Sequence, residues 1–90
     1  MLEAVFLGLC LNAYDIASVH ASLLGLSEIE AALDEKEFAV GDALLDRMGD
    51  DQAGAIAVLQ DGYRSVAAMS GADLTAQIER CDSALAGLFP

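Results

Sequence analysis

The residues best suited to catalysis or metal binding are a single histidine, His20, and two cysteines, Cys10 and Cys81. A histidine that acts as a general base needs a positioned partner, and a zinc site needs three or four ligands, often in closely spaced pairs. The sequence contains no Cys-x-x-Cys, Cys-x-x-His or His-Glu-x-x-His motif. One disulfide is possible, but the spacing shows no disulfide framework. We therefore interpret the cysteines as reduced core residues and predict no metal and no cofactor.

Other catalytic motifs do not occur either. The sequence has no glycine-rich phosphate loop and no Gly-x-Ser-x-Gly element. The acidic run at residues 34–41 lacks the Asp-x-Asp-x-Asp-Gly order of a calcium loop. We predict that the protein is not an enzyme.

The carboxylates are the most informative group in the sequence. The chain has fifteen acidic and only four basic residues, which gives a formal net charge of −11. If residues 28–51 form a helix, five carboxylates share a narrow arc on one side of it. Those that are seven positions apart lie about 10 Å apart along the helix axis. This set, called the acidic face below, comprises Glu28, Glu35, Asp42, Asp46 and Asp50. It is either a solvated surface that maintains solubility or a partner-binding site.

The charge excludes several classes of partner. Binding to nucleic acid requires clustered Lys and Arg, and an anionic membrane would repel the chain. A row of carboxylates can dock on a basic groove of another protein or imitate a phosphate track. We predict a binding protein that regulates, chaperones or inhibits a partner with a basic surface. The alternative is a nucleic-acid-mimicking inhibitor that blocks a DNA- or RNA-binding machine.

The elements that position this face are predicted to be helices. The chain is 56% hydrophobic and 6% aromatic, and its only proline is the last residue. Apolar residues recur at helical spacing in four segments, which end near Gly25, Gly49 and Gly71 or at the C-terminus. Short connections place neighbouring helices antiparallel. We predict one domain, residues 1–90, with an all-α, up-down-up-down four-helix bundle.

Helix starts are also visible in the sequence. Ser27 followed by Glu30 has the spacing of a capping box. Asp50 or Asp51 is expected to cap the third helix, and Asp73 the fourth.

The second predicted helix, from about residue 28 to 48, is either one continuous helix or two shorter ones. Phe38 and Leu45 lie off its apolar core row and indicate a second contact. The charged run at 34–37 and the internal Gly41 weaken its middle, so a break near residues 35–39 is the alternative. The core row consists of Ile29, Leu33, Val40 and Leu44.

The first predicted helix, residues 2–24, is apolar nearly all round in its first three turns. Such a helix is buried on several sides or forms an oligomer interface. We predict a homodimer through an interface that contains Leu2, Val5, Phe6 and Leu9. The stretch 4–11 is too short to span a bilayer and lacks a preceding positive region. We predict no membrane association and a cytoplasmic location.

One segment resembles a known class of proteins. Residues 29–47, IEAALDEKEFAVGDALLDR, resemble small helical export chaperones of the flagellar and type III secretion kind, with an acidic-aromatic step, a Leu-Leu pair and an arginine. The resemblance does not extend to the rest of the chain and implies no residue roles. In size and charge alone, the chain is similar to small acidic phage-encoded inhibitors, including anti-CRISPR proteins.

Overall fold

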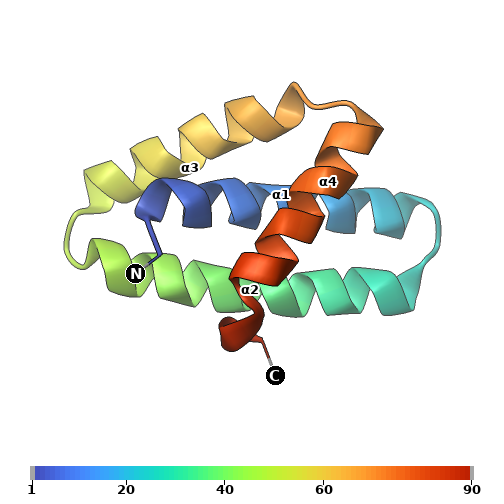
Figure 1. Ribbon diagram of the computed structural model, residues 1–90, viewed down its shortest axis with the longest axis horizontal. Helices are drawn as coiled ribbons and strands as arrows, with labels where there is room; N and C mark the ends of the chain where they lie inside the picture. Colours follow the sequence, from blue (N-terminus) through green and yellow to red (C-terminus); the bar gives the residue numbers. More distant parts are fainter. Residues whose placement is uncertain (1, 90) are drawn as a thin grey trace.

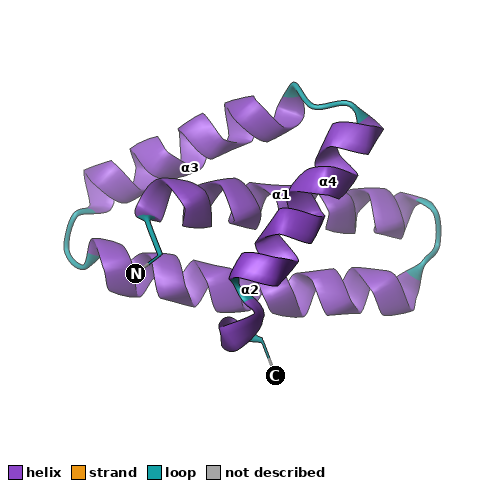
Figure 2. Ribbon diagram, viewed as in Figure 1, coloured by secondary structure: helices purple, strands orange, loops and turns teal. Residues whose placement is uncertain are grey.

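The computed structural model describes residues 2–89, which form four α-helices and a short 3₁₀ turn (Figure 1). The elements are α1 (Ala4–Leu23), α2 (Ser27–Met48), α3 (Gln52–Ala67), α4 (Gly71–Ala84) and η1 (Ala86–Leu88). No strand occurs within this range (Figure 2). The predicted all-helical four-helix fold is confirmed. α2 is continuous, so the alternative break near residues 35–39 is not realised.

The arrangement is centred on α1, which contacts all three other helices. α1 and α2 form an antiparallel hairpin, and α3 runs along the other side of α1 (Figure 1). α4 crosses α1 obliquely (Figure 1). The bundle is therefore closed by a crossing helix rather than by one that lies alongside its neighbours.

The first two connections are closed by glycines in the left-handed region. Gly25 has a φ of 73° and Gly49 a φ of 59°. A side chain with a Cβ is strained there, which explains why glycine ends these helices. Asp51 caps α3 as predicted, because its carboxylate accepts a hydrogen bond of 2.9 Å from the Gly54 amide.

Two predicted caps are wrong. Leu26, not Ser27, occupies the N-cap of α2 and makes no side-chain capping hydrogen bond in the described structure, so the Ser27–Glu30 capping box does not form. The helix starts one residue earlier than a capping box requires, which places the Ser27 hydroxyl inside the first turn.

The start of α4 also differs from the prediction. Ser70 is the N-cap, and its hydroxyl accepts a 3.1 Å hydrogen bond from the amide of Asp73. Asp73 therefore lies in the first turn, where a carboxylate favours the helix dipole. Gly71 begins α4 and does not end α3, which stops at Ala67.

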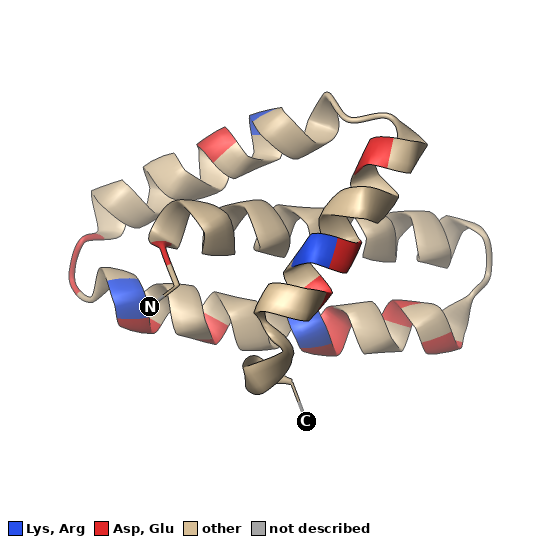
Figure 3. Cartoon of the chain, viewed as in Figure 1, with Lys and Arg blue, Asp and Glu red and all other residues tan. Residues whose placement is uncertain are grey.

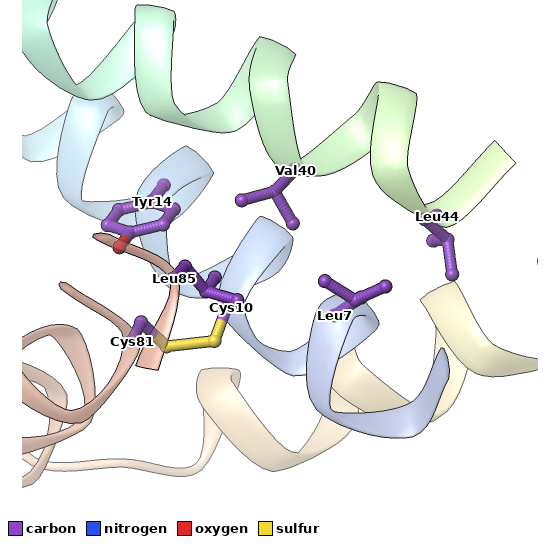
Figure 4. Packing of buried hydrophobic residues seen from close by; sticks show 7 residues of the cluster. All are labelled: Leu7, Cys10, Tyr14, Val40, Leu44, Cys81 and Leu85. Atoms are coloured by element: carbon purple, nitrogen blue, oxygen red, sulfur yellow. A yellow bond between two sulfur atoms is a disulfide. The ribbon is translucent and has the colours of Figure 1, made fainter. Parts of the chain in front are cut away.

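The main core joins α1, α2 and the C-terminal part of the chain (Figure 4). Its fully buried members are Leu7, Cys10, Tyr14, Val40, Leu44, Cys81 and Leu85. Cys10 and Cys81 form a disulfide between α1 and α4, so the prediction of reduced cysteines is wrong. The crossing of α4 brings their Cα atoms to 5.7 Å, a separation typical of disulfides, although the residues are 71 positions apart.

α1 and α3 approach each other through two glycines. A Cβ on Gly62 would lie 2.7 Å from the carbonyl oxygen of Gly8 and 2.9 Å from Asn12 Nδ2. The buried Asn12 amide donates to the carbonyl oxygens of Gly8 at 2.8 Å and Leu59 at 3.0 Å. The side chain of Asn12 therefore bridges two helices at a place where neither glycine has room for a side chain.

α1 is long and apolar enough to cross a membrane by length and composition, with an 18-residue window of mean hydropathy 1.3. The sequence prediction considered only residues 4–11, and the apolar helix is longer than that. In the structure α1 is the central helix of the bundle, and its polar residues Asn12 and Ser18 are buried against other helices.

Candidate partner-binding surface

Four of the five acidic-face residues lie along one side of α2, as their helical spacing predicted. These four are Glu28, Glu35, Asp42 and Asp46, while Asp50 follows in the α2–α3 turn, and all five residues are exposed. Figure 3 shows acidic positions in red along α2. At 100° per residue the four on α2 share an arc of about 40°, roughly opposite the buried Val40 and Leu44. The helix that buries its apolar row in the core therefore presents these carboxylates to solvent.

The two basic side chains of α2 interact with residues outside the acidic face. Lys36 Nζ lies 3.0 Å from Asp82 Oδ1 on α4 and within 6 Å of the ring centroids of Tyr14 and Phe89. Arg47 Nε donates to the carbonyl oxygen of Leu2 at 3.3 Å.

The ion pairs among residues 2–89 are Lys36–Asp82 and Arg64–Asp61. Neither involves a carboxylate of the acidic face. This face therefore carries a negative potential that the chain itself does not neutralise.

An apolar groove lies beside the acidic face. Phe38 and Leu45 are 73% and 64% exposed, and Gly41 lies between them on the same side of α2. Because Gly41 has no side chain, Leu11 of α1 reaches the groove, with its Cδ1 only 3.6 Å from where a Gly41 Cβ would be. We call this the α2 groove, and its lining residues are Leu11, Asp34, Glu37, Phe38, Gly41, Asp42 and Leu45.

The sequence indicated only part of this groove. Phe38 and Leu45 were recognised as lying outside the core row. Leu11, Asp34 and Glu37 were missed, because their place in the groove depends on how α1 packs against α2. The one available signal was the internal Gly41, a residue that helices avoid unless something approaches closely.

Glu37 has a perturbed carboxyl group at the edge of the α2 groove. Burial, followed by the nearby Asp15 and then Asp34, raises its pKa from 4.5 to about 7. Asp34 in turn accepts a hydrogen bond from the hydroxyl of Ser18 on α1. Three carboxyl groups therefore converge where α1 meets α2, and the ionised form of Glu37 is disfavoured there.

Replacing Glu37 is expected to stabilise the protein at alkaline pH. The folded-state pKa exceeds the unfolded value, so the stability linked to this proton is complete below pH 4.5 and lost as the pH rises through about 7. Glu37→Gln is neutral at every pH. After allowance for solvent screening we expect a gain of about 1 kcal/mol at pH 8, or about 4–8 °C in Tm, and little difference at pH 4.

Thermal unfolding followed by circular dichroism measures this effect. Glu35→Gln is the matched control, because it removes the same charge from an exposed position on the same helix. Equal stabilisation by both variants at pH 8 would mean that only the net charge matters. It would contradict the idea that ionisation is unfavourable specifically at Glu37.

The predicted oligomer interface is largely used inside the monomer. Leu2 and Phe6 pack against the main core, and Leu9 packs against a smaller cluster formed around Ala13. Val5, by contrast, is 68% exposed. Burial against three helices accounts for much of the apolar character of α1, and the homodimer stays a prediction.

His20 does not join the two cysteines in a site. His20 is exposed in the last turn of α1, while the two cysteines are bonded to each other and have no thiol to offer a metal. Within residues 2–89, no three His, Cys, Asp or Glu side chains are arranged to hold a metal ion. The buried Tyr14 hydroxyl donates to Asp82 Oδ1 at 2.7 Å, and burial raises its pKa far above the ordinary value.

No family model, curated protein or solved structure matches this chain. The resemblance of residues 29–47 to export chaperones thus gains no support from these comparisons.

Proposed function

We propose that this chain is a non-enzymatic protein that binds a basic surface of another protein through its acidic face and thereby regulates, chaperones or inhibits it. The observation that supports this most is the set of five exposed carboxylates with no cation partner in the described chain. Like charges held on one side of a helix repel each other, and a cationic partner removes this repulsion on binding. The same field accelerates the encounter with such a partner.

The alternative proposal, mimicry of nucleic acid, fits the charge density less well. The four carboxylates on α2 extend over about 27 Å of helix, or about one per 7 Å. Double-stranded DNA carries one charge per about 1.7 Å. The acidic face therefore suits a few discrete lysines or arginines better than a surface built for a phosphate backbone. Competition by double-stranded DNA for the captured partner distinguishes the two proposals.

Affinity capture from an extract of the native host tests the proposal, with three forms of the protein immobilised in parallel. The wild type is the first form. The second, the face-reversed variant, carries Glu35→Lys, Asp42→Lys and Asp46→Lys. The third, a control of identical net charge, carries Glu3→Lys, Asp61→Lys and Glu79→Lys, all at exposed positions outside the acidic face.

We expect the wild type and the control to retain the same basic protein, and the face-reversed variant to lose at least about 90% of it, a tenfold effect. Equal loss in both variants would show that only the overall charge matters. Undiminished capture by the face-reversed variant would refute the proposal.

The cellular location is a separate question. The buried Cys10–Cys81 disulfide favours an oxidising compartment, because cytosolic thiols are ordinarily kept reduced. The cytoplasmic location stays a prediction, and the disulfide argues against it.

A further inference from the structure

We propose that the α2 groove binds a cationic amphipathic helix of the partner protein. This inference rests on the proposed function and specifies which element of the partner is recognised. It goes beyond the acidic face, because it assigns an apolar anchor as well as a charge pattern.

The apolar part of the groove has the dimensions of a helix-binding site. Phe38 and Leu45 are exposed side chains two turns apart, and the bare backbone of Gly41 lies between them. From Asp34 to Leu45 the groove follows α2 for about 17 Å. That length matches about three turns of a helix that inserts apolar residues at positions i, i+3 or i+4, and i+7. Exposed apolar side chains of this size gain free energy when a partner covers them.

The charges around the groove select a cationic occupant. Asp34 and Glu37 line it together with Asp42, and Asp42 also belongs to the acidic face. Lysine or arginine side chains flanking the apolar side of the incoming helix would lie beside these carboxylates. A cation near Glu37 would also relieve the repulsion that Asp15 and Asp34 exert on it.

A second copy of this chain does not fit the same groove. It would bring another chain of net charge −11 against these carboxylates and would add the repulsion that a cation removes.

The α1–α2 turn exposes another apolar group, which includes Leu23, Leu24 and Leu26. The surface depression at this turn, lined by residues 25–29, contains one carboxylate, that of Glu28. This turn lacks the several carboxylates that surround the α2 groove. It supplies a matched control position, because Leu24 and Phe38 are both 73% exposed.

Fluorescence anisotropy with two synthetic peptides tests the inference. Both peptides contain only Leu and Lys, with the same composition and a length of about 18 residues, or about 27 Å as a helix. In the first peptide the leucines recur at helical spacing and form one face, and in the second they are scrambled. The first should bind the wild type at least about tenfold more tightly and should gain helicity in circular dichroism when bound.

Three variants locate the binding site. Phe38→Ser removes the exposed anchor and should reduce the affinity for the amphipathic peptide to that for the scrambled one. Gly41→Leu fills the groove without introducing a poor helix former and should have the same effect. Leu24→Ser removes an equally exposed apolar side chain at the turn and should leave the affinity unchanged.

The outcomes separate this inference from the proposed function. Equal affinity for both peptides, lost in the face-reversed variant, would overturn the groove and leave the proposed function standing. If neither peptide binds, the groove inference fails, while the capture experiment still decides the proposed function. Loss of binding in Leu24→Ser but not in Phe38→Ser would move the site to the turn and overturn the inference. A wild-type dimer in sedimentation velocity that Phe38→Ser dissociates would make the occupant a second copy, which also overturns it.

Discussion

Reduction of the Cys10–Cys81 disulfide is expected to lower the free energy of unfolding by about 4 kcal/mol. The bond closes a loop of 71 positions, and the loop entropy that it removes from the unfolded chain corresponds to about that value. Domains of this size have only about 5–15 kcal/mol in total. Both cysteines are fully buried in the main core, and the bond ties α4 to α1. Without it, α4 keeps its apolar packing and the hydrogen bond from Tyr14 to Asp82.

Urea unfolding followed by circular dichroism, with and without a phosphine reductant, measures the loss. The double variant Cys10→Ala with Cys81→Ala is the control, since it should unfold at the same low urea concentration in both conditions. An identical midpoint for oxidised and reduced wild type would contradict the expected contribution of the bond.

Gly62→Ala is expected to destabilise the protein by about 2 kcal/mol, even though alanine favours helices more than glycine does. The new Cβ would lie 2.7 Å from the carbonyl oxygen of Gly8, a backbone atom that cannot rotate away. α1 and α3 must then separate, which weakens the hydrogen bond from Asn12 to the Leu59 carbonyl oxygen. Overpacking of this kind costs about 1–3 kcal/mol or more and exceeds the gain of about 1 kcal/mol in helix propensity.

Thermal unfolding should show a decrease in Tm of about 10 °C for Gly62→Ala. Gly71→Ala provides the matched control, because a Cβ at Gly71 meets nothing within 4 Å. We expect its Tm to stay the same or rise slightly. A rise of similar size in both variants would show that α1 and α3 are not packed this closely.

The helical pattern of the sequence predicted local structure well and interhelical detail poorly. In the last predicted segment, Leu74, Cys81 and Leu85 recur at helical spacing and are all buried, whereas Leu88 continues the same row and is exposed. In the third predicted segment, Ile56, Tyr63 and Val66 recur at helical spacing, but only Val66 is buried. Ile56 and Tyr63 are exposed, while Gly62 is buried instead. Periodicity identifies an apolar face, but which part of that face is covered depends on where the neighbouring helix lies.

Spacing along the chain was enough to predict the four helices, the glycines that end α1 and α2, and the acidic face. These features are local, because the helical repeat converts spacing along the chain into position around an axis. Three features could be found only in the folded structure: the crossing of α4, the disulfide that joins α1 to α4, and the α2 groove with the raised pKa of Glu37. Each of these needs side chains from segments far apart in the sequence, and their distances are set by how the helices pack, not by any spacing along the chain.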